Sequence, residues 1–303
     1  MIIIQVAGGL GNQMQQYALY RKFLSLGKVA KLDISWFTES TRQDRVYAKR
    51  QLELDYFDGL QYEVCTEDEK RALVGDGSLP SKLMQKVKGK LFPDSKKVFF
   101  ETDMYHPEIF DYENKYLCGY FACEKYYADI MEELRESMRV PPSGNPENDR
   151  LAEKMQQKES VSIHIRRGDY LDPENAAMFG GICTEEYYDG AIREMRNLYP
   201  DAHFYLFSDD ISYVRERYRG EAYTAVDVNR GKDSFYDIWL MSHCRHQICA
   251  NSTFSFWGAR LNGNRDKVII RPWIHKNSQK FEAAQMHDLW KGWVLMDKNG
   301  NVV

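Results

Sequence analysis

Several features are absent from this 303-residue sequence, and each absence excludes a class of protein. No apolar run approaches the length that spans a bilayer, so we expect no transmembrane segment and at most peripheral membrane association. The N-terminus, MIIIQVAGG, has no basic leader and is typical of a first strand, which predicts a cytoplasmic protein. The formal net charge of -4 predicts no nucleic-acid partner but leaves room for a local basic pocket that binds a small anion.

Cysteine motifs are also absent. The six cysteines form no CxxC pair and most have apolar neighbours, which predicts free, buried thiols in a reducing compartment. His243, Cys244, His246 and Cys249 lie close together in sequence, but their order matches no common zinc spacing. We therefore predict no zinc site there.

Other catalytic motifs are weak or missing. Glu101-Thr102-Asp103 and Glu53-x-Asp55 have the form of an acidic metal-binding motif, but two acids at that spacing occur often by chance. No G-x-S-x-G elbow is present, which argues against Ser-His-Asp hydrolysis. The sequence also has no internal repeat and no low-complexity segment.

The chain is long enough for two domains. Segment 139–150, RVPPSGNPENDR, holds three prolines and a glycine and is the best linker in the sequence. We therefore predict an N-terminal domain at 1–145 and a C-terminal domain at 146–303, the second with a clean α/β alternation.

Hydrophobic periodicity predicts the individual elements. We expect strands at 2–6, 29–33, 98–101, 116–121, 161–165, 203–207, 223–226, 247–250 and 268–270. We expect helices at 14–26, 67–74, 79–91, 124–138, 149–157, 185–198, 213–218 and 234–241, with another helix beginning after Asn251.

Segment 161–170, VSIHIRRGDY, joins a strand pattern to charge. Alternation places His164 and Arg166 on the same side of the strand and Arg167 on another. The strand must stop at Gly168, so both arginines lie at a carboxyl end, where open α/β sheets bind ligands. One interpretation is an ion pair with Asp169 or another carboxylate. We favour a phosphate clamp by Arg166, because a guanidinium matches phosphate oxygens two at a time.

A glycine-rich loop, residues 8–13, joins the first strand to the first helix. Such a loop at a helix N-terminus is an anion-binding device. Gly9-x-Gly11 followed by Asp33 also mimics a nicotinamide-dinucleotide fingerprint, but the third glycine of that fingerprint would fall at Met14. An NAD-dependent oxidoreductase is therefore a weak alternative, and a tight turn that needs a positive φ is a structural one.

Two further loops follow predicted strands of the second domain. Asp209 or Asp210 can accept a hydrogen bond from a nucleotide base or a ribose hydroxyl. The other loop, NSTFS at 251–255, offers side-chain and backbone donors to phosphate oxygens, although serine and threonine there are also ordinary N-cap residues.

Four motifs, which occur in the same order along the chain as in the family, together resemble a known family. HIRRGDY (164–170), FSDD (207–210), ANSTFSFWGA (250–259) and GGLGNQM (8–14) resemble the bacterial α-1,2-fucosyltransferases of glycosyltransferase family 11. The resemblance covers most of the chain. It implies an α/β, GT-B-like fold with two Rossmann-like domains that face each other across a cleft.

The resemblance also implies a reaction: inverting transfer of L-fucose from GDP-fucose (GDP-β-L-fucose) to the 2-hydroxyl of a galactose-terminated oligosaccharide, without a cofactor or metal. It assigns catalytic roles to Arg166, His164, Asp169 and Asn12. The substrate-binding residues it implies are Gly9, Gly11, Arg167, Ser208, Asp209, Asn251, Ser252, Thr253, Ser255 and Phe256. Gln15, Phe256 and Arg260 depart from the family pattern beside the motifs, where they bear on acceptor preference. A fucosyltransferase of other linkage and a glycan-binding protein are further alternatives.

Overall fold

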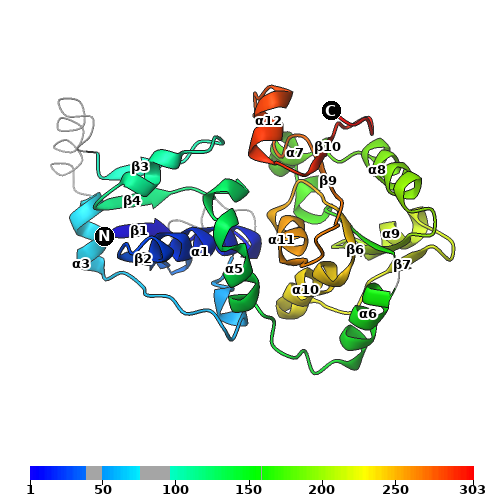
Figure 1. Ribbon diagram of the computed structural model, residues 1–303, viewed down its shortest axis with the longest axis horizontal. Helices are drawn as coiled ribbons and strands as arrows, with labels where there is room; N and C mark the ends of the chain where they lie inside the picture. The colour runs from blue at the N-terminus through cyan, green and yellow to red at the C-terminus, as the bar shows by residue number, and fades with distance from the viewer. Residues whose placement is uncertain (39–49, 76–95, 158) are drawn as a thin grey trace. The chain divides into compact units, whose positions relative to one another are not determined.

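The computed structural model describes residues 1–38, 50–75, 96–157 and 159–303, without the side chains of Asp169 and Glu174 (Figure 1). The predicted helix at 79–91 lies outside the described residues. Two compact units are present, one made of Met1–Asp55 and Gly59–Ser137, the other of Tyr56–Asp58 and Met138–Val303. Each is described by itself. The chain leaves the first unit at Ser137, just before the predicted linker, and the predicted split at 145/146 stays a prediction.

The first unit is a parallel sheet of order β2-β1-β4-β3. Its strands are β1 (Ile2–Gln5), β2 (Ala30–Asp33), β3 (Val98–Phe100) and β4 (Lys115–Cys118). Its α-helices are α1 (Leu10–Ser25), α3 (Glu67–Val74) and α5 (Met131–Ser137). The apolar β1 sequence suits a central parallel strand, which is covered on both faces.

Helix α1 is buried almost all round, although it carries three glutamines. Two of these satisfy backbone groups of the loops beside it. Gln13 Nε2 donates to the carbonyls of Gly8 and Gln51, and Gln16 binds the amide of Ala7 and the carbonyl of Gly119. Buried amide side chains therefore fix the loop that follows β1.

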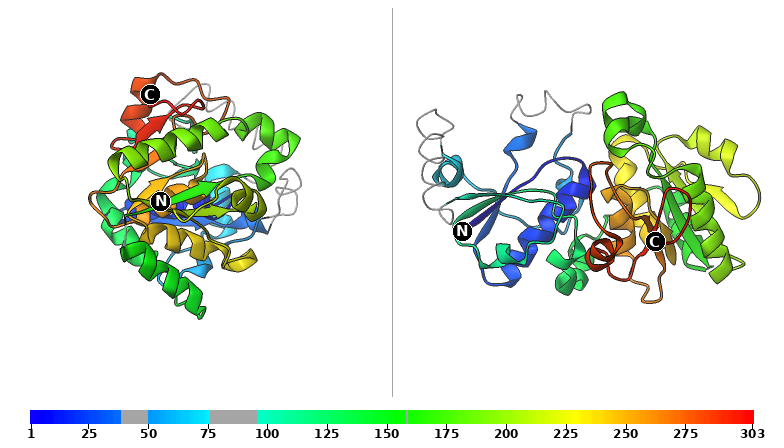
Figure 2. Two further views of the ribbon diagram at one scale, coloured as in Figure 1. Left: turned by 90° about the vertical axis from the view of Figure 1, so that its right-hand side faces the viewer. Right: turned by 90° about the horizontal axis from the view of Figure 1, so that it is seen from above.

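The second unit is a six-stranded parallel sheet of order β10-β9-β8-β5-β6-β7. Its strands are β5 (Ser160–Ile165), β6 (His203–Ser208), β7 (Tyr223–Ala225), β8 (His246–Ile248), β9 (Ile269–Pro272) and β10 (Val294–Met296). Its α-helices are α6 (Pro146–Gln157), α7 (Pro173–Phe179), α8 (Glu185–Leu198), α9 (Ile211–Arg217), α10 (Tyr236–His243), α11 (Thr253–Leu261) and α12 (Ala283–Leu289). Helices cover both faces of this sheet (Figure 2).

The two faces of β5 have different surroundings. Val161, Ile163 and Ile165 pack into a core cluster with Tyr187 of α8 and Val214 of α9. His164 lies on the other face, against Phe254 of α11. Strand alternation thus separates the apolar core from the residues that lead to the candidate site.

The predicted α/β class and the two Rossmann-like halves of a GT-B-like fold are confirmed by these parallel units, and the cleft stays a prediction. Within the described residues, no helix has both the length and the apolarity to cross a membrane.

Two predicted elements are wrong in the first unit. The helix expected at 124–138 is broken into η5 (Glu124–Tyr126), η6 (Ala128–Ile130) and α5. The buried Tyr126 ring packs edge-on against Tyr105 and Phe121, and this tertiary packing overrides helix continuity. The strand expected at 116–121 stops at Cys118, because the backbone turns through Phe121 at φ 50°.

In the second unit, α6 begins earlier than the helix predicted at 149–157, and two α-helices and one strand were not predicted. Pro146 begins α6 inside the predicted linker, as proline at a first helical position can. Helices α7 and α12 and strand β10 are short, so their periodicity is too brief to identify from sequence.

Candidate functional site

Two of the predicted loops lie side by side at the carboxyl edge of the second unit's sheet. Strands β5 and β6 pair in parallel with Ile165 opposite Ser208. The next residues, Arg166 and Asp209, therefore leave the sheet as neighbours. This edge is where open α/β sheets place ligands.

Each of the two arginines has a carboxylate partner. Arg166 Nη1 lies 2.9 Å from Asp209 Oδ2, and Arg167 Nε lies 3.0 Å from Asp210 Oδ2. The Arg167 amide also donates to Asp209 Oδ1 at 2.9 Å. Both arginines thus fit the ion-pair interpretation, because parallel pairing of β5 and β6 puts two aspartates beside them, and the phosphate clamp by Arg166 stays a prediction.

Asp210 is the N-cap residue of α9, and Arg167, from the segment after β5, binds it. The Asp210 side chain caps that helix by accepting from the Tyr213 amide, and this bond together with Arg167 lowers the pKa of Asp210. The Arg167 guanidinium lies 3.8 Å from the centre of the Tyr213 ring. Ser208 Oγ accepts from the Asp210 amide at 3.0 Å. Ser208 and Arg167 thus shape this turn.

Gly168 is needed for space rather than for an unusual backbone angle. A Cβ at this position would lie 3.0 Å from Asp209 Cγ and still closer to Oδ2. Any side chain at residue 168 would therefore push the carboxylate away from Arg166 and from the Arg167 amide.

His164 is a poor proton acceptor in this setting. It is 5% exposed, and Nδ1 has no hydrogen-bond partner in the described residues. Burial, with the nearby Arg166 charge, lowers the pKa of His164 to about 3. An efficient general base has a pKa near the working pH, so a neutral, positioning imidazole fits better. The Asp169 side chain lies outside the described residues.

The N-terminus of α11 follows β8 at the same edge. Ser252 is the N-cap residue of α11 but makes no side-chain cap hydrogen bond. The N-cap alternative therefore does not account for its hydroxyl, and the helix start retains the positive end of its dipole. Ser255 is 2% exposed and donates to the Ser252 carbonyl at 3.0 Å, so it faces the interior.

Asn251 is a structural junction. Its Nδ2 group donates to the carbonyls of Phe179 and His275, and its own carbonyl accepts from the Tyr170 hydroxyl. Both amide hydrogens are used by backbone groups, so the prediction that Asn251 donates to phosphate does not fit this arrangement. It instead joins the segments after β5, β8 and β9.

The prediction that Phe256 contacts substrate is wrong for this structure. Phe256 is 1% exposed and packs against Trp290 and Trp293, because residues 254 and 256 lie on different faces of α11. The Phe254 ring lies beside His164, tilted and with ring centres 5.5 Å apart, and is one residue that sequence reasoning missed. Helical spacing places residues 254 and 256 on different faces, but only the structure shows which face meets His164.

A second missed residue is Arg271 at the end of β9. It is fully buried, and its Nη1 and Nη2 atoms have no partner among the described residues. Its guanidinium lies 3.8 Å from the Trp290 ring centre, and burial lowers the pKa of Arg271 to about 9. Arg260, a departure from the family pattern, is also buried beside Trp290.

In the glycine loop of the first unit, the backbone requires glycine at one position, Gly8. Gly8 has φ 84°, and a Cβ there would lie 2.7 Å from Asn12 Nδ2. Gly9 is the N-cap of α1 at φ -78°, and Gly11 lies within the helix. Asn12 is partly exposed in the first turn and its amide donates to the Gly9 carbonyl.

Asp33, the acidic residue on which the dinucleotide alternative depends, is buried and paired within the first unit. Asp33 is 2% exposed, accepts from the Tyr116 hydroxyl and the Ser35 amide, and pairs with Lys70 at 3.3 Å. Burial raises the pKa of Asp33, but the hydrogen bonds from Ser35 and Tyr116 together outweigh burial, so the net pKa is lowered. Asp33 is therefore an internal charge of the first unit.

The acidic triplet also has a structural partner. Glu101 accepts hydrogen bonds from the amides of Tyr120 and Phe121. Of the residues described here, no three His, Cys, Asp or Glu side chains gather in a way that suits a metal ion.

The comparisons with known proteins agree with these motifs. The model of the family described as "Glycosyl transferase family 11" matches residues 101–297. The chain belongs to glycosyl transferase family 11. That match includes both arginines, Asp209 and the α11 start.

Relatives of this family 11 protein include an alpha-1,2-colitosyltransferase from Escherichia coli. It is 31% identical, over 98% of this chain and 99% of its own. The galactoside 2-alpha-L-fucosyltransferase Sec1 of Mus musculus is 30% identical over 44% of this chain and 37% of its own. A solved fucosyltransferase, NodZ from Bradyrhizobium, aligns over 85% of this chain and 91% of its own with 15% identity and a TM-score of 0.45.

Proposed function

We propose that this family 11 transferase moves L-fucose from GDP-β-L-fucose to the 2-hydroxyl of a terminal galactose, with inversion at the anomeric carbon. The observation that carries the proposal is the Arg166–Asp209 pair beside the start of α11 at one carboxyl edge. Family membership and the partial likeness to a galactoside 2-alpha-L-fucosyltransferase support the sugar and the linkage.

The difficult part of the reaction is departure of GDP, because negative charge grows on the β-phosphate. Arg166 supplies positive charge and hydrogen-bond donors for that oxygen, and Asp209 holds its guanidinium in place. The helix dipole at the α11 N-terminus adds to the same stabilisation.

The mechanism also requires that water be kept from the reacting sugar and that the acceptor hydroxyl lose its proton. Phe254 and the neutral His164 form a partly apolar wall beside this edge, which keeps solvent from the departing group. The sugar becomes oxocarbenium-like as GDP leaves, so the galactose hydroxyl needs only modest activation. We assign no proton acceptor to His164, given its low pKa.

A second donor has a specific observation in its favour. One relative that matches nearly the whole chain is an alpha-1,2-colitosyltransferase. Colitose is fucose without the 3-hydroxyl, so GDP-colitose would use the same nucleotide contacts. The two candidates differ only in what surrounds C3 of the sugar.

Initial rates with the two donors separate these candidates. We expect GDP-fucose to give the higher kcat/KM with a lactose or N-acetyllactosamine acceptor, and the product linkage to be α-1,2 by NMR. A higher kcat/KM with GDP-colitose would assign the colitosyl reaction. Absence of transfer from both donors, with several galactose-terminated acceptors, would reject the proposal.

A further inference from the structure

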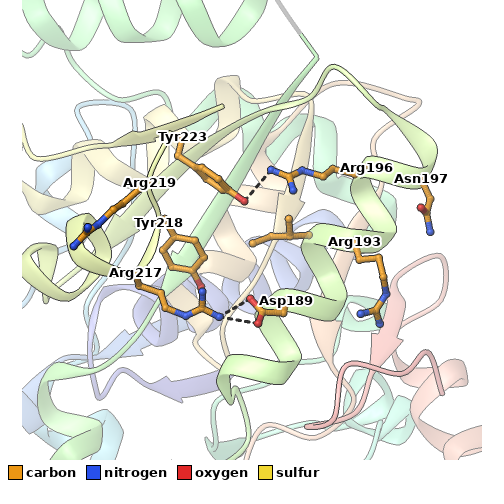
Figure 3. Close-up of a pocket in the computed structure, with 9 residues that line it drawn as sticks. Asp189, Arg193, Arg196, Asn197, Arg217, Tyr218, Arg219 and Tyr223 are labelled. Atoms are coloured by element: carbon orange, nitrogen blue, oxygen red, sulfur yellow. Dashed lines mark hydrogen bonds and ion pairs between the residues drawn. The ribbon is translucent and has the colours of Figure 1, made fainter. Parts of the chain in front are cut away.

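A basic pocket lies on the second unit away from the candidate site. It has a volume of about 550 Å3 and is formed by the second half of α8, the end of α9 and the start of β7 (Figure 3). Strands β6 and β7 begin on this side and end at the candidate site. The pocket and the candidate site are therefore at opposite edges of the same sheet.

Four arginines line this pocket: Arg193, Arg196, Arg217 and Arg219. Among the described residues, Arg217 is the one arginine of the four with acidic partners: its Nη2 lies 2.7 Å from both oxygens of Asp189 (Figure 3), and its Nε lies 3.5 Å from Glu185 Oε2. The lining thus has three more positive than negative charges. The whole chain, by contrast, has a net charge of -4.

The other three arginines donate to neutral groups. Arg193 donates to the Gly300 carbonyl, Arg196 to the Tyr223 hydroxyl and Arg219 to the Glu216 carbonyl. In the part of the chain that the structure describes, no carboxylate lies within ion-pair distance of these three. Each guanidinium has five N–H donors, so one neutral acceptor leaves most of its binding capacity unused.

Helix ends explain only part of this charge. Cations are favourable in the last turn of a helix, and α8 and α9 both end here. Each helix end carries roughly half a negative charge, so two ends offset about one of the three excess charges. Glu185 beside Arg217 offsets another, and the positive charge that is left suits an external anion.

A buried hydroxyl in the lining also points to a ligand. Tyr218 is 8% exposed, and its hydroxyl has no hydrogen-bond partner among the described residues. Leaving a buried hydroxyl unpaired costs free energy that a bound acceptor would recover. In Figure 3 the Tyr218 ring lies beside the Arg217 side chain.

We propose that this arginine pocket binds a phosphate group, as a distinct site from that of the sugar donor. Phosphate suits the lining because it has several acceptor oxygens and two charges, and guanidinium groups bind it bidentately. The phosphate belongs either to a free phosphorylated compound or to the headgroup of a membrane lipid, and the recognition chemistry is the same.

Titration of the full-length protein with inorganic pyrophosphate tests the site. We expect Arg193→Gln and Arg196→Gln each to weaken binding by about three- to tenfold, because a partly exposed charged hydrogen bond is lost. Tyr218→Phe should weaken it too, without loss of thermal stability. Arg150→Gln is the matched control, since it removes one charge from an exposed arginine of α6.

Two further arms locate the binding and its source. The loss of pyrophosphate affinity in the pocket variants should persist with saturating GDP, and GDP binding is measured separately. Sedimentation with phosphatidylcholine vesicles, with or without phosphatidylglycerol, should show retention that the pocket variants lose if the source is a lipid. The proposal is overturned if neither probe distinguishes the pocket variants from Arg150→Gln, or if GDP abolishes pyrophosphate binding.

Discussion

Gly168 shows how one absent side chain positions the charges of the candidate site. We predict that Gly168→Ala lowers kcat by about ten- to a hundredfold, because the new methyl group displaces Asp209 from Arg166 and a misplaced catalytic group is costly. The measurement is steady-state kinetics with a thermal melt. Gly263→Ala is the control, since no atom lies within 4 Å of a Cβ there. Equal kinetics in the two variants would show that the Asp209 position does not matter.

The two arginines can be separated by conservative changes. Arg166→Lys keeps the charge but loses the planar fork, so we expect turnover to fall by about 10²–10³ at saturating donor while the melting temperature is retained. Arg167→Lys should affect turnover less and stability more, because Arg167 stacks on Tyr213 and binds Asp210. A nearly normal Arg166→Lys beside a folded but inactive Arg167→Lys would exchange the two roles.

At the scale of elements, a polar network joins α6 and α10. Asn229 binds Asn148 of α6 and donates to Asp237 Oδ1 of α10 at 2.8 Å. Burial, reinforced by Asp227, raises the pKa of Asp237 to about 7. Asp227 itself pairs with Arg215 and Arg230. The folded protein therefore holds a proton on Asp237 at pH values where the unfolded chain has lost it.

This proton gives stability a definite pH dependence. Because the folded pKa is raised, the free energy of unfolding should fall as pH rises from about 4 to about 7 and then level off. Asp237→Asn keeps an acceptor for Asn229 but cannot titrate, so it should be more stable than wild type at pH 8 by on the order of 2–4 kcal/mol. Denaturant unfolding at pH 4.5 and pH 8 measures the difference. The assignment of the raised pKa to Asp237 would be contradicted if the stability difference between Asp237→Asn and wild type were the same at both pH values. It would also be contradicted if the exposed control Asp233→Asn gave the same difference.

At the scale of the whole molecule, a protein with a net negative charge must stabilise an anionic leaving group. We predict that transfer proceeds without a divalent cation, because Arg166 and the α11 dipole supply the positive charge. Initial rates should be unchanged in excess EDTA. Loss of activity on chelation, with recovery on adding manganese or magnesium, would require a metal in the mechanism.

The sequence by itself determined the features that depend on local pattern. Alternation in 161–165 identified β5, and hydrophobic periodicity in 185–198 identified α8, at whose start the Thr184 hydroxyl accepts from the Tyr187 amide. The family was also readable, because its motifs are contiguous runs of residues. Such features require only neighbours in the chain, so no knowledge of distant contacts is needed.

Only the tertiary structure decided which distant groups meet. The ion pair of Arg166 with Asp209 depends on β5 and β6 pairing in one register, and the two residues are far apart in sequence. The facing of α11 placed Phe254 beside His164 and buried Phe256. The arginine pocket likewise combines residues of α8, α9 and β7 that are far apart in sequence. The physical reason is that partners and burial are set by packing between elements, which local periodicity does not encode.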